Sequence, residues 1–279
     1  TTTGSNISLD GSGYLGATQA GTDGYMIVSA GPCSINQNPA FTDSPEIVDS
    51  RDILERFRDQ APPGEFSLTI LARPWGTAGR APMGDTLFES LMCKKTTNAG
   101  VSVVYSQDLS KPSFSLWVQK SHSLIFATGC AVTKGRVSLS NKGAVQWDLS
   151  GNFFKMGWVG TDSLSGTEAA AQTELSVHNA DRFCIGGLIQ NSTTSNDGDN
   201  GGAGFKITDV DYTNNTITIT PAVPSGGWAE NDVIEPFLPV GVVLGDPIES
   251  RHTAVTIDSV SSTIKTMDLT IDDAAKFMD

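Results

Sequence analysis

The chain has 279 residues, of which 38% are hydrophobic and 18% are charged, and it contains 29 glycines and 13 prolines. A chain of this length can bury a core without disulfides or metals. The composition excludes a coiled coil, a collagen and a charge-rich disordered chain. No run of 18 or more apolar residues occurs, so the sequence predicts no membrane-spanning helix.

The net charge is −13, and most of it lies in the last third of the chain. Residues 1–180 hold 16 acidic and 13 basic side chains, whereas residues 181–279 hold 15 acidic and 5 basic ones. Proteins that grip nucleic acids neutralise phosphates with lysine and arginine. The charge therefore argues against a nucleic-acid-binding function.

Candidates for metal or catalytic chemistry are sparse. The three histidines, His122, His178 and His252, are isolated, and no CxxC, HxH, HxxxH or GxSxG pattern occurs. We therefore predict no enzyme, no catalytic residue, no metal and no cofactor. The four cysteines are widely spaced: Cys33, Cys93, Cys130 and Cys184. They could form two disulfides or remain four free thiols, and the sequence leaves both alternatives open.

Residues 1–40 carry only two charged side chains and are rich in Gly, Ser, Thr, Asn and Gln. Such a composition cannot bury a core by itself. We predict an extended arm that orders against a neighbouring subunit or ring, with an edge strand around residues 25–29 as the alternative. Apolar residues of the arm are candidates for a subunit interface: Leu15, Tyr25 and Ile27.

Residues 41–200 are predicted to form the main domain, an antiparallel β-sandwich or barrel with one short flanking helix. Residues 65–72 alternate apolar and polar side chains, as a half-buried strand does. Thr86 and Glu89 fit a capping box for a helix over about 86–93 that ends near two lysines. Beyond the helix, β-rich runs alternate with short polar turns, which favours antiparallel sheets.

The last third of the chain predicts a second β unit. Residues 168–174 suggest a short helix, and an Asn-Asn turn at 214–215 between alternating strands predicts a hairpin. The hairpin belongs to a small β module over 201–251, either outer or inserted. Residues 252–279 predict strands that complete the sandwich or a neighbour's sheet, or that begin a second sandwich copy in a longer chain.

Two motif-like segments predict loops rather than ligand sites. Residues 11–16 fit GxGxxG but lack the strand and helix that a nucleotide site needs, and the acidic loop 197–201 lacks the later Glu of a calcium loop. Trp117 and Trp147 fall on predicted strands and are expected in the core. Loop residues are further candidates for the subunit interface: Trp75, Arg80 and Trp228.

Residues 65–71 form a predicted strand, and after a long loop residues 86–92 form a helix. The runs LIFATGCAVTKGRVSLS (residues 124–140) and AVQWDLSGNF (residues 144–153) follow. In order and local pattern, residues 40–165 resemble the major tail protein, the tail tube subunit, of long, non-contractile-tailed bacteriophages.

The resemblance implies a β-sandwich flanked by a helix, in a structural virion protein. Subunits of that family usually form hexameric rings. When a chain carries two sandwiches, the ring is trimeric and therefore pseudo-hexameric. The rings stack into a hollow tail tube. The tube guides phage DNA to the cell without binding it specifically. The implied partners are further copies of the chain, a tape-measure protein, and tail terminator and distal tail proteins. The implied location is the virion tail, assembled in the host bacterial cytoplasm.

A conduit for DNA must not hold it, so the resemblance and the net charge together predict an acidic lumen. Three other functions stay open. A virion adhesin would recognise carbohydrate with loop tryptophans. A secreted hydrolase with a β-sandwich would need a cleft with paired carboxylates. The tube of a bacterial secretion machine would share the fold.

Overall fold

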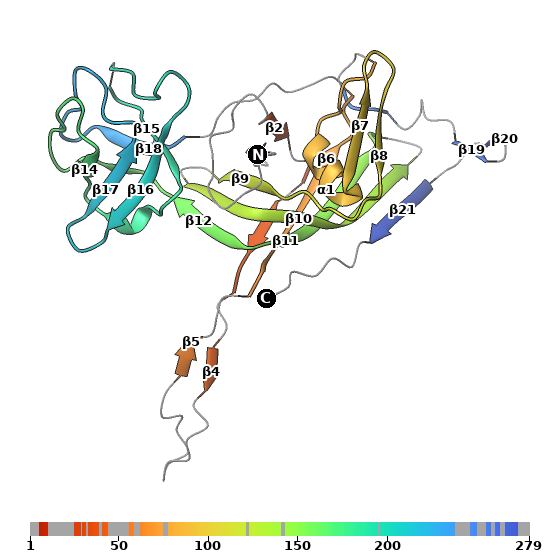
Figure 1. Cartoon of the computed structure of the whole chain (residues 1–279), viewed down its shortest axis with the longest axis horizontal. Helices are drawn as coiled ribbons and strands as arrows, with labels where there is room; N and C mark the ends of the chain where they lie inside the picture. Colours follow the sequence, from red (N-terminus) through yellow and green to blue (C-terminus); the bar gives the residue numbers. More distant parts are fainter. Residues whose placement is uncertain are drawn as a thin grey trace, which may run out of the picture.

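The structure, a computed structural model, shows a mainly β protein with curled antiparallel sheets and one α-helix in its described part, which confirms the predicted fold class (Figure 1). It describes residues 6–10, 25–28, 30–31, 33–38, 41–43, 56–58, 62–74, 78–120, 123–140, 143–194, 196–237, 246–249, 255–257, 260–262 and 266–272.

The largest sheet has nine strands and folds into two layers through the long strand β10. The first part of β10 pairs with β9 and β12, and the second part pairs with β11 and β21. We call the layer β12-β10-β9-β1-β2 sheet A and the layer β21-β10-β11-β6-β3 sheet B. Gly129, with φ 66°, lies where β10 passes from one layer to the other. The strands are β1 (Asn6–Asp10), β2 (Tyr25–Val28), β3 (Ser34–Asn36), β6 (Gly64–Leu71), β9 (Phe114–Lys120), β10 (Ser123–Ser140), β11 (Gln146–Phe153), β12 (Lys155–Val159) and β21 (Thr266–Asp272).

The first hydrophobic core lies between sheets A and B. Alternate residues of β6 are buried in it, which confirms the strand predicted at 65–72. Two glycines make room for aromatic rings of neighbouring strands: a Cβ on Gly64 would lie 2.1 Å from the ring of Phe153, and one on Gly151 would lie 2.8 Å from the ring of Phe66. Larger residues at these two positions would therefore push the strands apart.

The helix predicted at about 86–93 is confirmed as α1 (Asp85–Met92), which covers one end of this core, but the predicted capping of its two ends is wrong. Gly84, with φ 89°, is the N-cap and no side chain caps the helix, because Thr86 already lies within the first turn. Cys93, with φ 76°, ends the helix, and the two lysines expected at its C-terminus start a strand instead. The buried face of the helix includes Leu87, Phe88 and Leu91.

A second sheet of six strands forms a small barrel beside sheet A (Figure 1). The strand order is β13-β18-β15-β16-β17-β14, and a bridge between Leu164 and Val177 joins the two ends of that order. The hairpin predicted around the Asn-Asn turn is confirmed as β16–β17. The strands are β13 (Asp162–Ser163), β14 (Glu174–Ser176), β15 (Leu188–Asn191), β16 (Phe205–Asp211), β17 (Thr216–Thr220) and β18 (Val233–Pro236). The 3-10 helix η1 (Ala180–Arg182) follows β14.

The barrel starts at Asp162, earlier than the module predicted at 201–251. The short helix predicted at 168–174 is wrong. Glu168 is buried and its carboxylate accepts a hydrogen bond of 2.7 Å from the N–H of Ser176, so the chain turns back on itself here. Ala171 takes a positive φ of 65° in that turn, which a helix does not allow.

The middle of sheet A, at β9 and the first half of β10, is buried on both faces because the barrel packs against the side that faces away from sheet B. Along β9, Leu116 and Val118 belong to the first core, whereas Trp117 between them belongs to the barrel core. Phe126 of β10 also packs in the barrel core. This double burial explains the apolar runs at residues 116–118 of β9 and 124–127 of β10.

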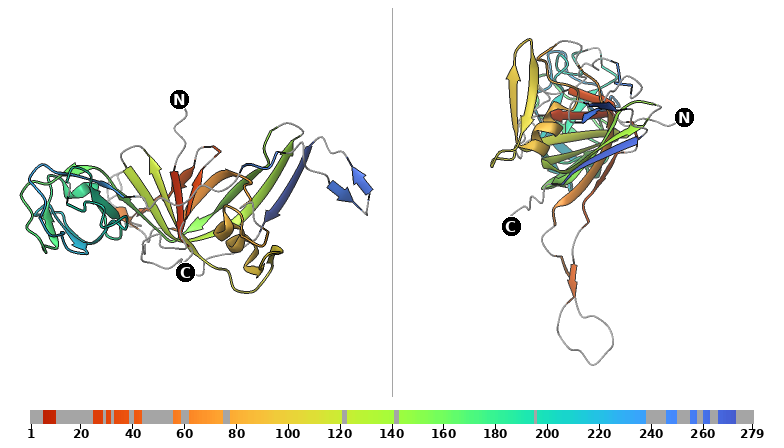
Figure 2. Two further views of the ribbon diagram at one scale, coloured as in Figure 1. Left: turned by 90° about the horizontal axis from the view of Figure 1, so that it is seen from above. Right: turned by 90° about the vertical axis from the view of Figure 1, so that its right-hand side faces the viewer.

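Three two-stranded ribbons extend from these layers (Figures 1 and 2). In each one the two strands pair with each other. One packs beside α1, whereas the other two project away from the body of the protein. They are β4 (Phe41–Asp43) with β5 (Arg56–Arg58), β7 (Lys94–Asn98) with β8 (Ser102–Ser106), and β19 (Val255–Ile257) with β20 (Val260–Ser262).

Parts of both chain ends complete the sandwich. Of the predicted arm 1–40, β1 lies between β2 and β9 in sheet A, and β3 pairs with β6 in sheet B. Much of the rest of that arm lies outside the described residues. Near the other end, β21 pairs with β10, so residues 266–272 join the sandwich rather than a second copy of it.

The double burial of sheet A generates the first prediction. We expect Trp117→Ala to lower the free energy of unfolding by about 3–5 kcal/mol, because it empties the contact between sheet A and the barrel. Trp158→Ala is the control, since Trp158 is 50% exposed and its loss should cost less than about 1 kcal/mol. Urea unfolding measures the free energy of unfolding of both variants. Equal losses in the two variants would contradict the burial of Trp117 between sheet A and the barrel.

Candidate assembly interface

Of the predicted interface residues, Tyr25, Ile27, Arg80 and Trp228 fall within the described residues. Tyr25 and Ile27 lie on β2, the last strand of sheet A, and Arg80 is exposed in the loop before α1. Leu15 and Trp75 lie outside the described residues. The surface that could hold a second subunit therefore has to be found from other features.

Trp228, the remaining loop candidate, is not at a surface, so that prediction is wrong. It is 2% exposed, and its ring meets that of Phe205 edge-on at 5.0 Å inside the barrel. A backbone bridge to Glu168 pulls the loop into the barrel wall. A lone tryptophan between a glycine and an alanine carries no sequence signal for this. The expected burial of Trp117 is confirmed, and Trp147 is partly buried against the first core.

β21 is an open edge of sheet B. One side of it pairs with β10 over its whole length, and among the described residues no strand pairs with the other side. An open edge presents unpaired N–H and C=O groups to which another strand can add. Leu269 on this strand is 51% exposed, so the edge also presents apolar surface.

Charged pairs attach β21 to β10. Arg136 lies 2.9 Å from Asp268, whose carboxylate also accepts a 2.9 Å hydrogen bond from the Ser138 hydroxyl. The hydrogen bond from Arg136, followed by that from Ser138, holds the pKa of Asp268 below its usual range. A lowered carboxyl pKa means that the contact is complete above about pH 4 and is lost as the pH falls further.

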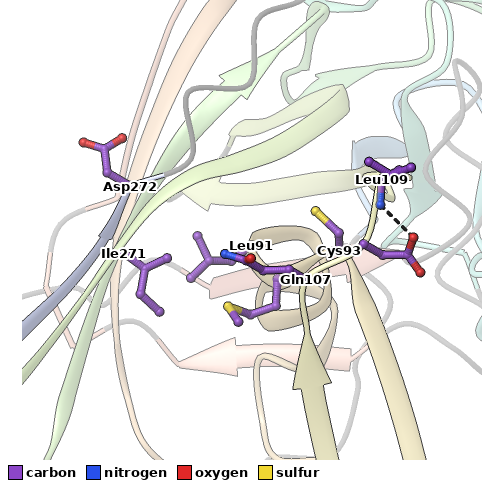
Figure 3. A pocket seen from close by; sticks show the side chains of 8 residues that line it. Leu91, Cys93, Gln107, Leu109, Ile271 and Asp272 are labelled. Atoms are coloured by element: carbon purple, nitrogen blue, oxygen red, sulfur yellow. Dashed lines mark hydrogen bonds between the residues drawn. The ribbon is translucent and has the colours of Figure 1, made fainter.

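An apolar groove runs beside this edge, between β21, α1 and the end of β8. It consists of two neighbouring hollows that share Leu91, Met92 and Ile271. One hollow, of about 320 Å³, has almost entirely apolar walls that include Phe88, Tyr105 and Trp147. The other, of about 600 Å³, has Leu91 and Ile271 toward one end and Leu109 toward the other (Figure 3). Asp108 also lines this larger hollow, whereas the side chain of Asp272 points away from it, toward the outer face of sheet B.

A small polar network holds the β7–β8 ribbon on α1 and so shapes one wall of the groove. Lys95 lies 2.7 Å from Asp85 and 3.4 Å from Glu89, and the Tyr105 hydroxyl donates to Asp85 at 2.5 Å. Burial lowers the pKa of Lys95, but its hydrogen bonds and charge interactions with Asp85 and Glu89 outweigh burial and raise it. The ammonium group is thus held charged at neutral pH.

The described residues offer little reactive chemistry. All four cysteines are free thiols, so two disulfides are not formed. Burial raises the pKa of Cys130 and of Cys184, and thiols of this kind are unreactive. No group of three or more His, Cys, Asp or Glu side chains in the described ranges could hold a metal ion. No helix in the described part of the chain is long and apolar enough to cross a membrane.

No family model and no curated protein matches this chain. The function of this chain therefore has to be inferred without the known activity of a family or the known partners of a relative. Its own surfaces, above all the open edge of β21 and the groove beside it, carry the functional conclusion.

The network on α1 generates the second prediction. We expect Asp85→Asn to lower the free energy of unfolding by about 1 kcal/mol at pH 7, because half-buried charged hydrogen bonds contribute about that much. Because the pKa of Lys95 is higher in the folded than in the unfolded chain, the charged lysine stabilises the fold at a pH below its unfolded pKa. The stability difference between wild type and Asp85→Asn should therefore shrink as the pH rises above about 10.5. Asp108→Asn is the control, since Asp108 is exposed and 3.8 Å from Lys94. A pH-independent loss would contradict the role of Lys95.

Proposed function

We propose that this chain is the tail tube subunit of a long, non-contractile phage tail. It would be a structural virion protein that assembles with copies of itself into stacked rings, which form a hollow conduit for DNA around a tape-measure protein. The observation that carries the proposal is the open edge of β21 beside an uncovered apolar groove. Monomeric proteins commonly block such edges, whereas assemblies pair them.

The two ends of sheet B support a ring. The sheet ends at β21 on one side and at β3 on the other. Pairing β21 of one copy with β3 of the next is a head-to-tail contact, and such contacts close into rings when the rotation between subunits permits. A closed ring of sheets leaves no free edge.

The outer face of sheet B has the character that a DNA conduit needs. Its side chains are mostly short and polar, and its cations lie near carboxylates: Lys134 is 3.9 Å from Asp272, and Arg136 is 2.9 Å from Asp268. A surface with a net negative charge repels phosphates and lets DNA slide. This face supports the acidic lumen that the sequence predicts, with four acidic and two basic side chains: Glu65, Asp148, Asp268, Asp272, Lys134 and Arg136.

The projecting ribbons support stacking. β4–β5 and β19–β20 extend beyond both sheets (Figure 2). An isolated two-stranded ribbon is marginally stable in water, so each gains most by packing against another molecule.

A carbohydrate-binding adhesin is the alternative, and one surface observation favours it. Trp158 and Tyr212 are 50% and 56% exposed. Both hydrogen-bond to the same short segment: the Trp158 indole donates to the carbonyl of Asp181, and the Tyr212 hydroxyl donates to that of Phe183. Exposed aromatic rings with hydrogen-bonding groups suit sugar binding as well as protein contacts.

Electron microscopy with sedimentation over a range of protein concentrations tests the proposal. We expect monomers at low concentration, and rings or hollow tubes of uniform width at high concentration. A map of the tube should show the outer face of sheet B lining the lumen. Dispersed monomers at every concentration, or a lumen with net positive charge, would contradict it.

A glycan array run on the same preparation separates the two functions. Sugar binding that Trp158→Ala abolishes, in a protein that never assembles, would support the adhesin. Rings without sugar binding support the tube.

A further inference from the structure

The two edge strands of sheet B, β21 and β3, run in the same direction. The four neighbouring pairs along β21-β10-β11-β6-β3 are all antiparallel. The chain direction therefore reverses four times between β21 and β3. Because an even number of reversals restores the original direction, the two edges of the sheet are parallel to each other.

This shared direction limits how copies can join through their edges. Copies in a ring are related by rotation about the ring axis, so their strands keep the same sense along that axis. β21 of one copy and β3 of the next then lie side by side as parallel strands. An antiparallel join needs one copy turned over, as when β21 pairs with a second β21. Such a two-fold contact closes after two copies and builds no ring.

Charge disfavours that two-fold contact. On the outer face of sheet B, β21 carries Asp268, Thr270 and Asp272, which alternate with Leu269 and Ile271 on the face toward the first core. Two β21 strands paired antiparallel about Thr270 place Asp268 of each copy directly opposite Asp272 of the other. Like charges directly opposite each other destabilise a strand pair.

β3 carries the pattern that suits β21. Ile35 packs against the first core, whereas Ser34 and Asn36 are exposed on the outer face, where the Ser34 hydroxyl shares a 2.7 Å hydrogen bond with Ser67. Residues 33–38 hold no charged side chain. A strand of this kind can extend both faces of β21. Its apolar residue continues the face toward the core, and the Asn36 amide can donate to a carboxylate on the outer face.

We propose that β3 of one copy adds to β21 of the next as a parallel strand. We call this contact the seam. Sheet B then continues from copy to copy with its polar face toward the lumen, and evenly spaced, slanted backbone hydrogen bonds join the two strands. The seam also covers Leu269, which is 51% exposed in the single chain. The inference rests on the proposed function, because it specifies the contact within each ring.

A charge placed at the seam is the first test. We expect Leu269→Lys to raise the protein concentration needed for ring formation at least about tenfold, because a lysine on an edge strand opposes the addition of another strand. Val104→Lys is the matched control, since Val104 is 47% exposed on the β7–β8 ribbon and lies outside the seam. Equal effects of the two substitutions would overturn the proposal.

Cysteine cross-linking of assembled protein measures the direction of the seam. Cys93 and Cys184, the two cysteines that are only partly buried, are first replaced by serine. Each variant then carries one cysteine on β3, at position 34 or 36, and one on β21, at position 268, 270 or 272. A short bifunctional maleimide links thiols that lie close together, and gel electrophoresis separates linked chains. Circular dichroism checks that each variant folds.

The order of the cross-links gives the direction whatever the register. In a parallel seam, moving the cysteine of β3 from position 34 to 36 moves its best partner two residues toward the C-terminus of β21. The opposite shift, or rings without any cross-link, would overturn the parallel seam while the proposed function stands. Particles that never exceed two copies, or wild-type protein that forms no rings, would overturn the proposed function itself.

Discussion

The backbone hydrogen bonds of β10 determine the arrangement of the whole sandwich. One half of the strand pairs with β9 and β12, and the other half pairs with β11 and β21. Because a single strand supplies both layers, its bend sets how sheets A and B face each other and how wide the first core is. The same bend makes β21 the last strand of sheet B, since β10 has no other neighbour on that side among the described residues.

Sheets A and B differ in how much of their surface is buried, and this difference assigns stability mainly to sheet A and the proposed assembly surfaces to sheet B. The strands β9 and β10 in the middle of sheet A are buried on both faces, between the first core and the barrel, and β12 of the same sheet continues into the barrel. Sheet B is buried on one face only. Its other face is polar, one of its edges is open, and the groove next to that edge is uncovered. Burial of sheet A holds the subunit together, and sheet B keeps the surfaces through which we propose that copies meet.

Local patterns in the sequence predict part of this structure. Alternation of apolar residues predicts β6, the Asn-Asn turn predicts the β16–β17 hairpin, and apolar residues at helical spacing predict α1. Each of these depends on neighbours within about ten residues. The resemblance to tail tube subunits predicts a sandwich flanked by a helix, and the mainly β fold with one helix is confirmed at that coarser level.

Features that depend on distant residues are not predicted. Trp228 enters the barrel core only because its strand partner is Glu168, and the barrel begins at Asp162 because the ends of its strand order meet there. The groove needs α1 and the end of β8 together with β21, which comes much later in the sequence. No periodicity within any one of these segments indicates that together they leave an apolar hollow uncovered.

Amide hydrogen exchange of residues 266–272 tests most directly whether the open edge is where copies join. The measurement compares dilute monomer with protein at concentrations that favour assembly. The account predicts that exchange in β21 slows at least about tenfold on assembly, because a second strand then covers its outward N–H groups, while exchange in β16–β17 stays the same. Assembly that leaves the exchange of β21 unchanged would contradict the account.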